Sequence, residues 1–105
     1  MKLLLNAFSA NMLAGFPATV SFEEVSVEAA QSLLAGGFTS AVGHADTAAV
    51  FSSVLGTTVS MNRATLSLKS GDEAIVGQYI GPRMPEGTTT LPEGATIKWL
   101  VLRVA

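Results

Sequence analysis

The chain has no cysteine among its 105 residues and a single histidine, His44. The absence of cysteine excludes disulfide bonds and thiolate-based metal or redox chemistry. One histidine with scattered carboxylates does not supply the ligand set of a typical zinc site. We therefore expect neither a metal ion nor another cofactor.

Charge is also scarce, since charged residues make up 13% of the chain and the net charge is −2. Such a chain lacks the basic field that binding to a long nucleic acid requires, although a few local cations suffice for a small anion. No stretch approaches the ~20 consecutive apolar residues of a membrane span. The apolar run at residues 3–5 is too short for a secretory signal. We expect a cytoplasmic protein with no membrane partner.

Apolar residues are abundant, at 49% of the sequence. This fraction is high for a chain whose small size gives it a large surface relative to its volume. A second copy of the chain would cover the surplus apolar surface, so we expect a homodimer. The length is that of one domain, which we place at residues 1–105.

Hydrophobic patterning predicts an α/β fold: one domain with a mixed, roughly five-stranded sheet flanked by short helices. Strands are expected at residues 3–5, 18–25, 38–42, 64–69, 74–80 and 97–104. Helices are expected from Ser9 to about residue 13, after Ser26, and from near Asp46 to Gly56. The Asp46 carboxylate is predicted to accept bonds from the first N–H groups of its own helix. A turn at residues 70–72 is predicted to join two of the strands as a hairpin.

Two strand-to-helix junctions, residues 6–11 and 43–47, are candidate binding segments. In open α/β sheets ligands collect at the carboxyl ends of the strands, and a helix N-terminus favours a phosphate. If the two strands are neighbours, both junctions face one site. The second junction contains His44, but a lone histidine is more often structural, and the residues alone favour that interpretation.

A third candidate segment is the loop at residues 81–87, which contains Arg83 and Glu86 between prolines and glycines. A stiff loop suits a fixed cation for phosphate recognition. A surface ion pair between Arg83 and Glu86 explains the same spacing, and the residues alone favour it. Tyr79 and Trp99 lie within apolar strand patterns and are expected in the core or an interface.

Five blocks of the sequence resemble, in order and spacing, the viral type III anti-CRISPR ring nucleases and their cellular relatives. The resemblance covers nearly the whole chain up to about Gly87. The blocks are LNAFSANML at residues 5–13, VGHADT at 42–47, GTT at 56–58 with NR at 62–63, GDEA at 71–74, and IGPRMPEG at 80–87.

The resemblance implies a small α/β homodimer that binds cyclic tetra-adenylate across its interface and cuts it without metal, which switches off type III CRISPR signalling. It implies three catalytic residues: His44 as the catalytic histidine, Arg83, which also binds the ligand, and Glu86. The two junctions supply the other expected ligand-binding residues: Asn6, Ser9, Asn11, Gly43, Ala45, Asp46 and Thr47. A viral member would act in the host cytoplasm.

The implied reaction uses the ribose 2′-OH of the RNA as nucleophile, so it needs alignment rather than activation of water. His44 would protonate the departing 5′-oxygen, while Arg83 and the helix N-terminus stabilise the phosphorane charge. Glu86 would hold the 2′-OH or assist its deprotonation, and the products would be linear di-adenylates. The alternative is a non-catalytic protein that sequesters cyclic oligonucleotides. Net charge counts against a third interpretation, a DNA-binding viral protein.

Overall fold

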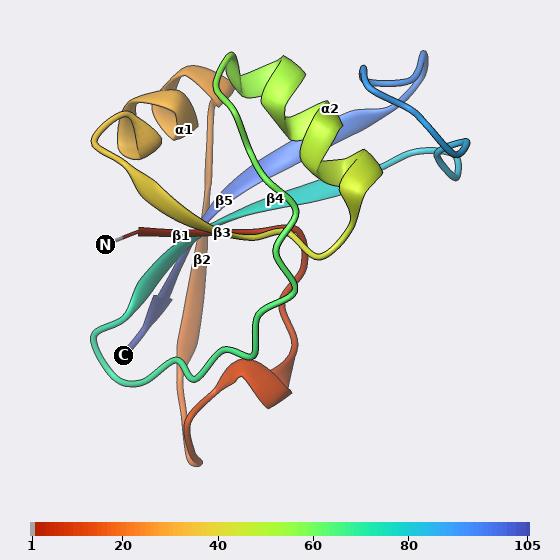
Figure 1. The fold of residues 1–105 in the computed structure, drawn as a ribbon. Coiled ribbons are helices and arrows are strands. Elements are labelled where there is room, and N and C mark those ends of the chain that lie inside the picture. The colour runs from red at the N-terminus through yellow and green to blue at the C-terminus, as the bar shows by residue number, and fades with distance from the viewer. Residues whose placement is uncertain (1) are drawn as a thin grey trace.

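The computed structural model describes residues 2–105 and contains five strands, two α-helices and one 3₁₀ helix (Figure 1). In chain order these are β1 (Lys2–Leu5), η1 (Ala10–Met12), β2 (Val20–Val25), α1 (Val27–Leu34), β3 (Phe38–Ala41), α2 (Ala45–Leu55), β4 (Glu73–Ile80) and β5 (Thr96–Val104). All five strands belong to one sheet with the order β2-β5-β4-β1-β3. The predicted α/β class with a five-stranded mixed sheet is confirmed.

Four of the strands run in the same direction, and three of these four are neighbours in the sheet. β1 lies between β3 and β4 and is parallel to both, with Leu3 paired to Thr39 on one side and to Ala74 on the other. β5 is antiparallel to its two neighbours, β2 and β4. The carboxyl ends of β1, β3 and β4 therefore meet at one edge of the sheet.

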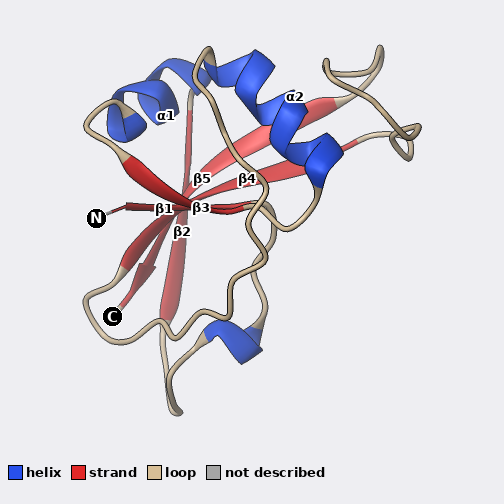
Figure 2. Cartoon of the chain, in the orientation of Figure 1, coloured by secondary structure: helices blue, strands red, loops and turns tan. Residues whose placement is uncertain are grey.

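Local signals define both α-helices, which lie on the same side of the sheet (Figure 2). The hydroxyl of Ser26 accepts a hydrogen bond from the Ala29 N–H group at 3.1 Å, so the predicted cap of α1 is confirmed. α2 ends at Gly56, whose φ of 71° lies in the left-handed region that glycine adopts without strain. No helix within residues 2–105 has both the length and the apolar character needed to cross a membrane.

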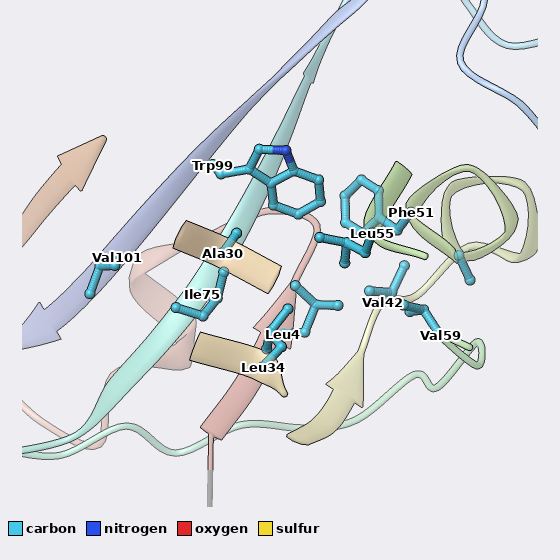
Figure 3. Close-up of a cluster of buried hydrophobic side chains, with 11 residues drawn as sticks. Leu4, Ala30, Leu34, Val42, Phe51, Leu55, Val59, Ile75, Trp99 and Val101 are labelled. Carbon is cyan, nitrogen blue, oxygen red and sulfur yellow. The ribbon is translucent and has the colours of Figure 1, made fainter. Parts of the chain in front are cut away.

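The main core lies between the helices and the sheet (Figure 3). Phe51 of α2 and Trp99 of β5 are buried, with ring centroids 5.0 Å apart and planes inclined by 59°. Both rings cover Gly77 of β4, where an added Cβ would lie 2.5 Å from a Phe51 ring atom and 2.7 Å from one of Trp99. The missing side chain at Gly77 thus lets α2 pack directly against the sheet, and the core position expected for Trp99 is confirmed.

The opposite face of the sheet is covered by η1 and by the segment between α2 and β4 (Figures 1 and 2). The strand predicted at residues 64–69 is wrong. This segment makes one isolated bridge, in which Leu68 exchanges backbone hydrogen bonds with Met12 and Ala14, both at 2.7 Å. Both sides of β4 are already paired, so the segment has no place beside it, and its apolar alternation reflects burial of Leu68 and Leu66 against the sheet. The turn at residues 70–72 is therefore not a hairpin between two strands.

β5 lies between β2 and β4 in the sheet, and the side chain of Arg103 on β5 forms hydrogen bonds with both neighbouring strands. The Arg103 guanidinium donates to Glu23 of β2 and to Glu73 of β4, both at 3.1 Å. The hydrogen bond to Glu23, followed by that to Glu73, raises the pKa of Arg103 above its ordinary value. These bonds lie on the exposed part of the sheet, away from the carboxyl ends of the parallel strands.

We predict that Gly77→Ala destabilises the protein by about 1–3 kcal/mol, because the new methyl group forces the Phe51 and Trp99 rings away from the sheet. Denaturant unfolding followed by Trp99 fluorescence measures the change. Gly36→Ala is the matched control, since a Cβ at Gly36 has no atom within 4 Å. Equal stability of the two variants would contradict the packing role given to Gly77.

Candidate functional site

Three chain connections meet where β1, β3 and β4 end. Asn6 follows β1, Gly43 and His44 follow β3, and Arg83 follows β4 shortly after Gly81. Because β1 lies between the other two strands, these connections are adjacent at one edge of the sheet (Figure 1). The rule that ligands bind at the carboxyl ends of parallel strands therefore selects this edge.

The backbone just before His44 is held by side chains from two other segments. The Gly43 N–H group donates to Oδ1 of Asn6 at 3.3 Å, and Nε of Arg63 donates to the Gly43 carbonyl at 3.0 Å. The Asn62 N–H group donates to the Val42 carbonyl at 2.8 Å. Both peptide groups that flank Gly43 are thus hydrogen-bonded, which fixes the direction in which the chain enters α2. Arg63, which is not among the predicted site residues, is part of this arrangement.

His44 occupies the N-cap position of α2 in an extended conformation. Its carbonyl accepts the first helical bond, from Ala48 at 3.0 Å, while its exposed imidazole caps no N–H group of the helix. The N–H groups of Ala45, Asp46 and Thr47 precede that first bond and are free of helical partners, as at any helix N-terminus. An imidazole and the positive end of a helix thus lie side by side, a setting suited to a phosphodiester.

The loop at residues 81–87, which we call the Arg83 loop, is tied to the strand before it. The Tyr79 hydroxyl donates to the Pro82 carbonyl at 2.6 Å. A Cβ at Gly81 would lie 2.6 Å from the Cβ of Ala95, so only glycine fits where the loop leaves β4. Close packing at this point sets the direction of the loop towards Arg83.

The far end of the Arg83 loop contacts α2. The Gly87 N–H group donates to Oδ1 of Asp46 at 3.3 Å. The prediction that Asp46 caps its own helix is therefore wrong. His44 occupies the cap position, and Asp46, in the first turn, directs its carboxylate to the loop instead. Glu86 precedes Gly87 and is exposed at the corner of a turn closed by the Thr88 N–H group and the Pro85 carbonyl at 3.2 Å.

An open cavity of about 550 Å³ lies between these segments. Five of the predicted site residues line it: Asn6, His44, Asp46, Thr47 and Arg83. Within the described part of the chain no ion pair joins Arg83 to Glu86, so the surface ion pair favoured by spacing alone is not formed. The exposed Arg83 guanidinium is available to an anion in the cavity.

Five predicted site residues do not line this cavity. Ser9 and Asn11 are exposed at η1, where Ser9 precedes the helix without a side-chain cap bond, and Glu86 is exposed on its turn. Gly43 and Ala45 flank His44 along the chain. No group of three or more His, Cys, Asp or Glu side chains between residues 2 and 105 is placed to hold a metal ion.

The sequence did not identify Gln78, Tyr79 and Met84, which also line the cavity. Tyr79 was expected in the core or an interface, whereas it is half-buried at the site. The signal that could have found it is the position of Tyr79 near the carboxyl end of β4. That signal was hidden because β4 was expected in a hairpin rather than parallel to β1.

Comparison with known proteins identifies the family of the chain. A family model described as STIV B116-like matches residues 2–98. The chain belongs to the STIV B116-like family. This confirms the family predicted from the five sequence blocks.

Among solved structures, B116 of Sulfolobus turreted icosahedral virus is similar to this B116-like chain. The two share 29% identity with a TM-score of 0.79, and the match covers 98% of this chain and 99% of the viral one. A viral protein thus has the same fold over almost its full length. No curated protein matches the chain.

We predict that Asn6→Ala lowers the free energy of unfolding by about 0.5–1.5 kcal/mol, because it removes the acceptor of the Gly43 N–H bond. Chemical denaturation measures the loss, and amide chemical shifts of Gly43 and His44 should move with it. Asn11→Ala is the matched control, since Asn11 is exposed in η1, and its stability should remain within about 0.5 kcal/mol of the parent. An equal loss in both variants would show that Asn6 does not hold the junction.

Proposed function

We propose that this B116-like protein is a metal-independent ring nuclease that cleaves cyclic tetra-adenylate into linear di-adenylates. The observation that carries the proposal is the convergence of the exposed His44 imidazole, the N-terminus of α2 and the exposed Arg83 on one cavity. These groups can supply a proton and stabilise negative charge, as phosphodiester transfer requires. The family and its viral member B116 support this assignment.

In the proposed reaction, the 2′-oxygen of one ribose attacks the adjacent phosphorus as the bond from phosphorus to the 5′-oxygen breaks. The proton of the 2′-OH passes to a base, and the imidazolium of His44 protonates the departing 5′-oxygen. A 2′,3′-cyclic phosphate and a 5′-OH result. Two such cuts at opposite positions of the ring release two di-adenylates.

The nucleophile belongs to the substrate, so the protein has to align it in line with the leaving oxygen and neutralise charge. Arg83 supplies a fixed cation, and the N–H groups of Ala45, Asp46 and Thr47 supply donors at the positive end of α2. Neither task requires a metal or a cofactor. Asn6 acts by holding Gly43, the residue before His44, and through its place on the cavity.

We assign Glu86 one of two roles: the base that deprotonates the 2′-OH, or the hydrogen-bond partner that holds it. Glu86 lies on the same loop as Arg83. The turn that contains Glu86 is attached to α2 by the hydrogen bond from the Gly87 N–H group to Asp46. In the free chain Glu86 is outside the cavity lining, and substrate binding has to bring it to the ribose. This position is also the observation that favours the second candidate, a protein that binds cyclic oligonucleotides without cutting them.

We assign the active form to a homodimer with one cavity from each copy facing the ring. The cavity of one chain is open to one side, and a cyclic tetranucleotide presents two equivalent halves. Large apolar side chains that a second copy could cover are exposed on the single chain: Phe16, Phe22, Met61 and Ile80. Cleavage of the ring would switch off type III CRISPR signalling in the cytoplasm where that messenger acts.

We predict that His44→Ala lowers the single-turnover rate of cyclic tetra-adenylate cleavage by about 10²–10⁴-fold, because the leaving oxygen loses its proton donor. The reaction is run with protein in excess over labelled substrate. The remaining substrate and the di-adenylate product are then separated on a gel. Added imidazole should restore part of the rate, and EDTA should leave the parent unchanged.

Thermal unfolding and binding of the intact ring by His44→Ala serve as controls and should match the parent. Cleavage by His44→Ala at the parent rate would falsify the role of His44. A parent protein that binds the ring without releasing di-adenylate would establish the sequestering function instead. A parent that does neither would refute both.

We predict that Arg83→Ala weakens binding of the intact ring by about 10–100-fold, since one charge-assisted hydrogen bond to a phosphate is lost. The affinity is measured by calorimetry in the His44→Ala background, where the ring stays intact. Arg103→Ala is the matched control, because its guanidinium bonds Glu23 and Glu73 on the sheet and is no part of the cavity. Equal affinities of the two arginine variants would remove Arg83 from the ligand site.

A further inference from the structure

We propose that Asp46 is a positioning residue that docks the Arg83 loop onto α2, an inference that rests on the proposed function. The bond from the Gly87 N–H group to Oδ1 of Asp46 joins residues 41 positions apart in the sequence. Among the hydrogen bonds of the described residues, it is the one that connects the loop to the helix that follows His44. Through it, a single carboxylate couples the segment carrying Arg83 and Glu86 to the catalytic histidine.

The loop geometry explains why Gly87 needs a partner. The turn at residues 85–88 is closed by the Thr88 N–H group, which donates to the Pro85 carbonyl, and Gly87 has a φ of 86°. A positive φ at the third residue is typical of a type II turn, in which the N–H group of that residue makes no bond within the turn. The Asp46 carboxylate supplies the missing acceptor, and Glu86 is thereby held one residue from the contact.

The other bonds of the loop do not reach α2. The Tyr79 hydroxyl bonds the Pro82 carbonyl at the beginning of the loop, and Thr88 bonds Pro85 at its end. The first of these bonds ties the loop to β4 and the second closes its last turn, so neither fixes the loop relative to α2. Without Asp46, the loop would be free to move as a unit relative to His44, and a displacement of about 1 Å can cost on the order of 10²-fold in rate.

The Asp46 carboxylate that holds the loop also lowers the affinity for the substrate. Asp46 lines the cavity, where its negative charge repels the phosphates of the ring. Charged acceptors make the stronger hydrogen bonds, and an acidic residue in the first turn favours the helix. Asp46 therefore lowers the affinity for the ring while it holds the loop in place. The effect of its charge appears in KM, and the effect of the held loop appears in kcat.

Asp46→Asn and Asp46→Ala distinguish the two effects. Both variants remove the charge, so KM for cyclic tetra-adenylate should fall about 2–5-fold in Asp46→Asn. Asparagine keeps an acceptor oxygen for Gly87 and alanine does not, so kcat of Asp46→Ala should be about tenfold below that of Asp46→Asn. Equal kcat values for the two variants would overturn the positioning role.

A readout independent of catalysis is the exchange rate of the Gly87 amide proton, measured by NMR on the free protein. Exchange should be about fivefold to tenfold faster in Asp46→Ala than in the parent and should stay slow in Asp46→Asn. Asp72→Ala is the matched control, since its carboxylate bonds the Lys69 N–H group at 2.9 Å outside the cavity, and it should alter neither Gly87 exchange nor kcat.

Unchanged Gly87 exchange in Asp46→Ala would refute the docking bond. If the parent protein does not cleave cyclic tetra-adenylate, the proposed function fails, and the exchange rates alone decide whether Asp46 docks the loop. The two failures are therefore distinguishable in one set of variants.

Discussion

The contact of Phe51 and Trp99 above Gly77 is the interaction on which the rest of the structure depends. It joins α2 to the two longest strands, and both rings are buried against a position without a side chain. Deleting a buried aromatic side chain typically costs about 3–5 kcal/mol, a large part of the stability of a small domain. Because α2 rests on this contact, its N-terminus and His44 are placed at the edge where the parallel strands end.

The site combines a rigid part with an adjustable one. Around Gly43, hydrogen bonds with Asn6 and Arg63 fix the backbone before His44. Across the cavity, the Arg83 loop is exposed and joined to α2 through Asp46. For the proposed reaction such a division is useful, since the proton donor has to be fixed while the exposed Glu86 side chain has to turn towards the ribose when the ring binds.

Several features of the fold and the site could be predicted from the sequence because their causes are local. Ser26 caps α1 and Gly56 ends α2 through contacts within one turn of each helix. The placement of His44 at a strand-to-helix junction has the same origin. The five sequence blocks predicted the family, and five of the ten predicted site residues, which come from separate segments, line one cavity.

Other features depended on contacts between distant segments. Apolar alternation at residues 64–69 is equally compatible with a strand and with a loop packed on a sheet, and only the occupied sides of β4 decide between them.

The sequence by itself determined the helices, their ends and the position of His44. These features depend on hydrogen bonds between residues a few positions apart, and the local sequence decides which of those bonds can form. Only the tertiary structure decided that β4 runs parallel to β1, which brings Tyr79 to the cavity, and that Asp46 bonds Gly87 rather than its own helix. The physical reason is that a strand or a carboxylate can take any of several partners of similar strength. Packing of the whole chain selects one of them.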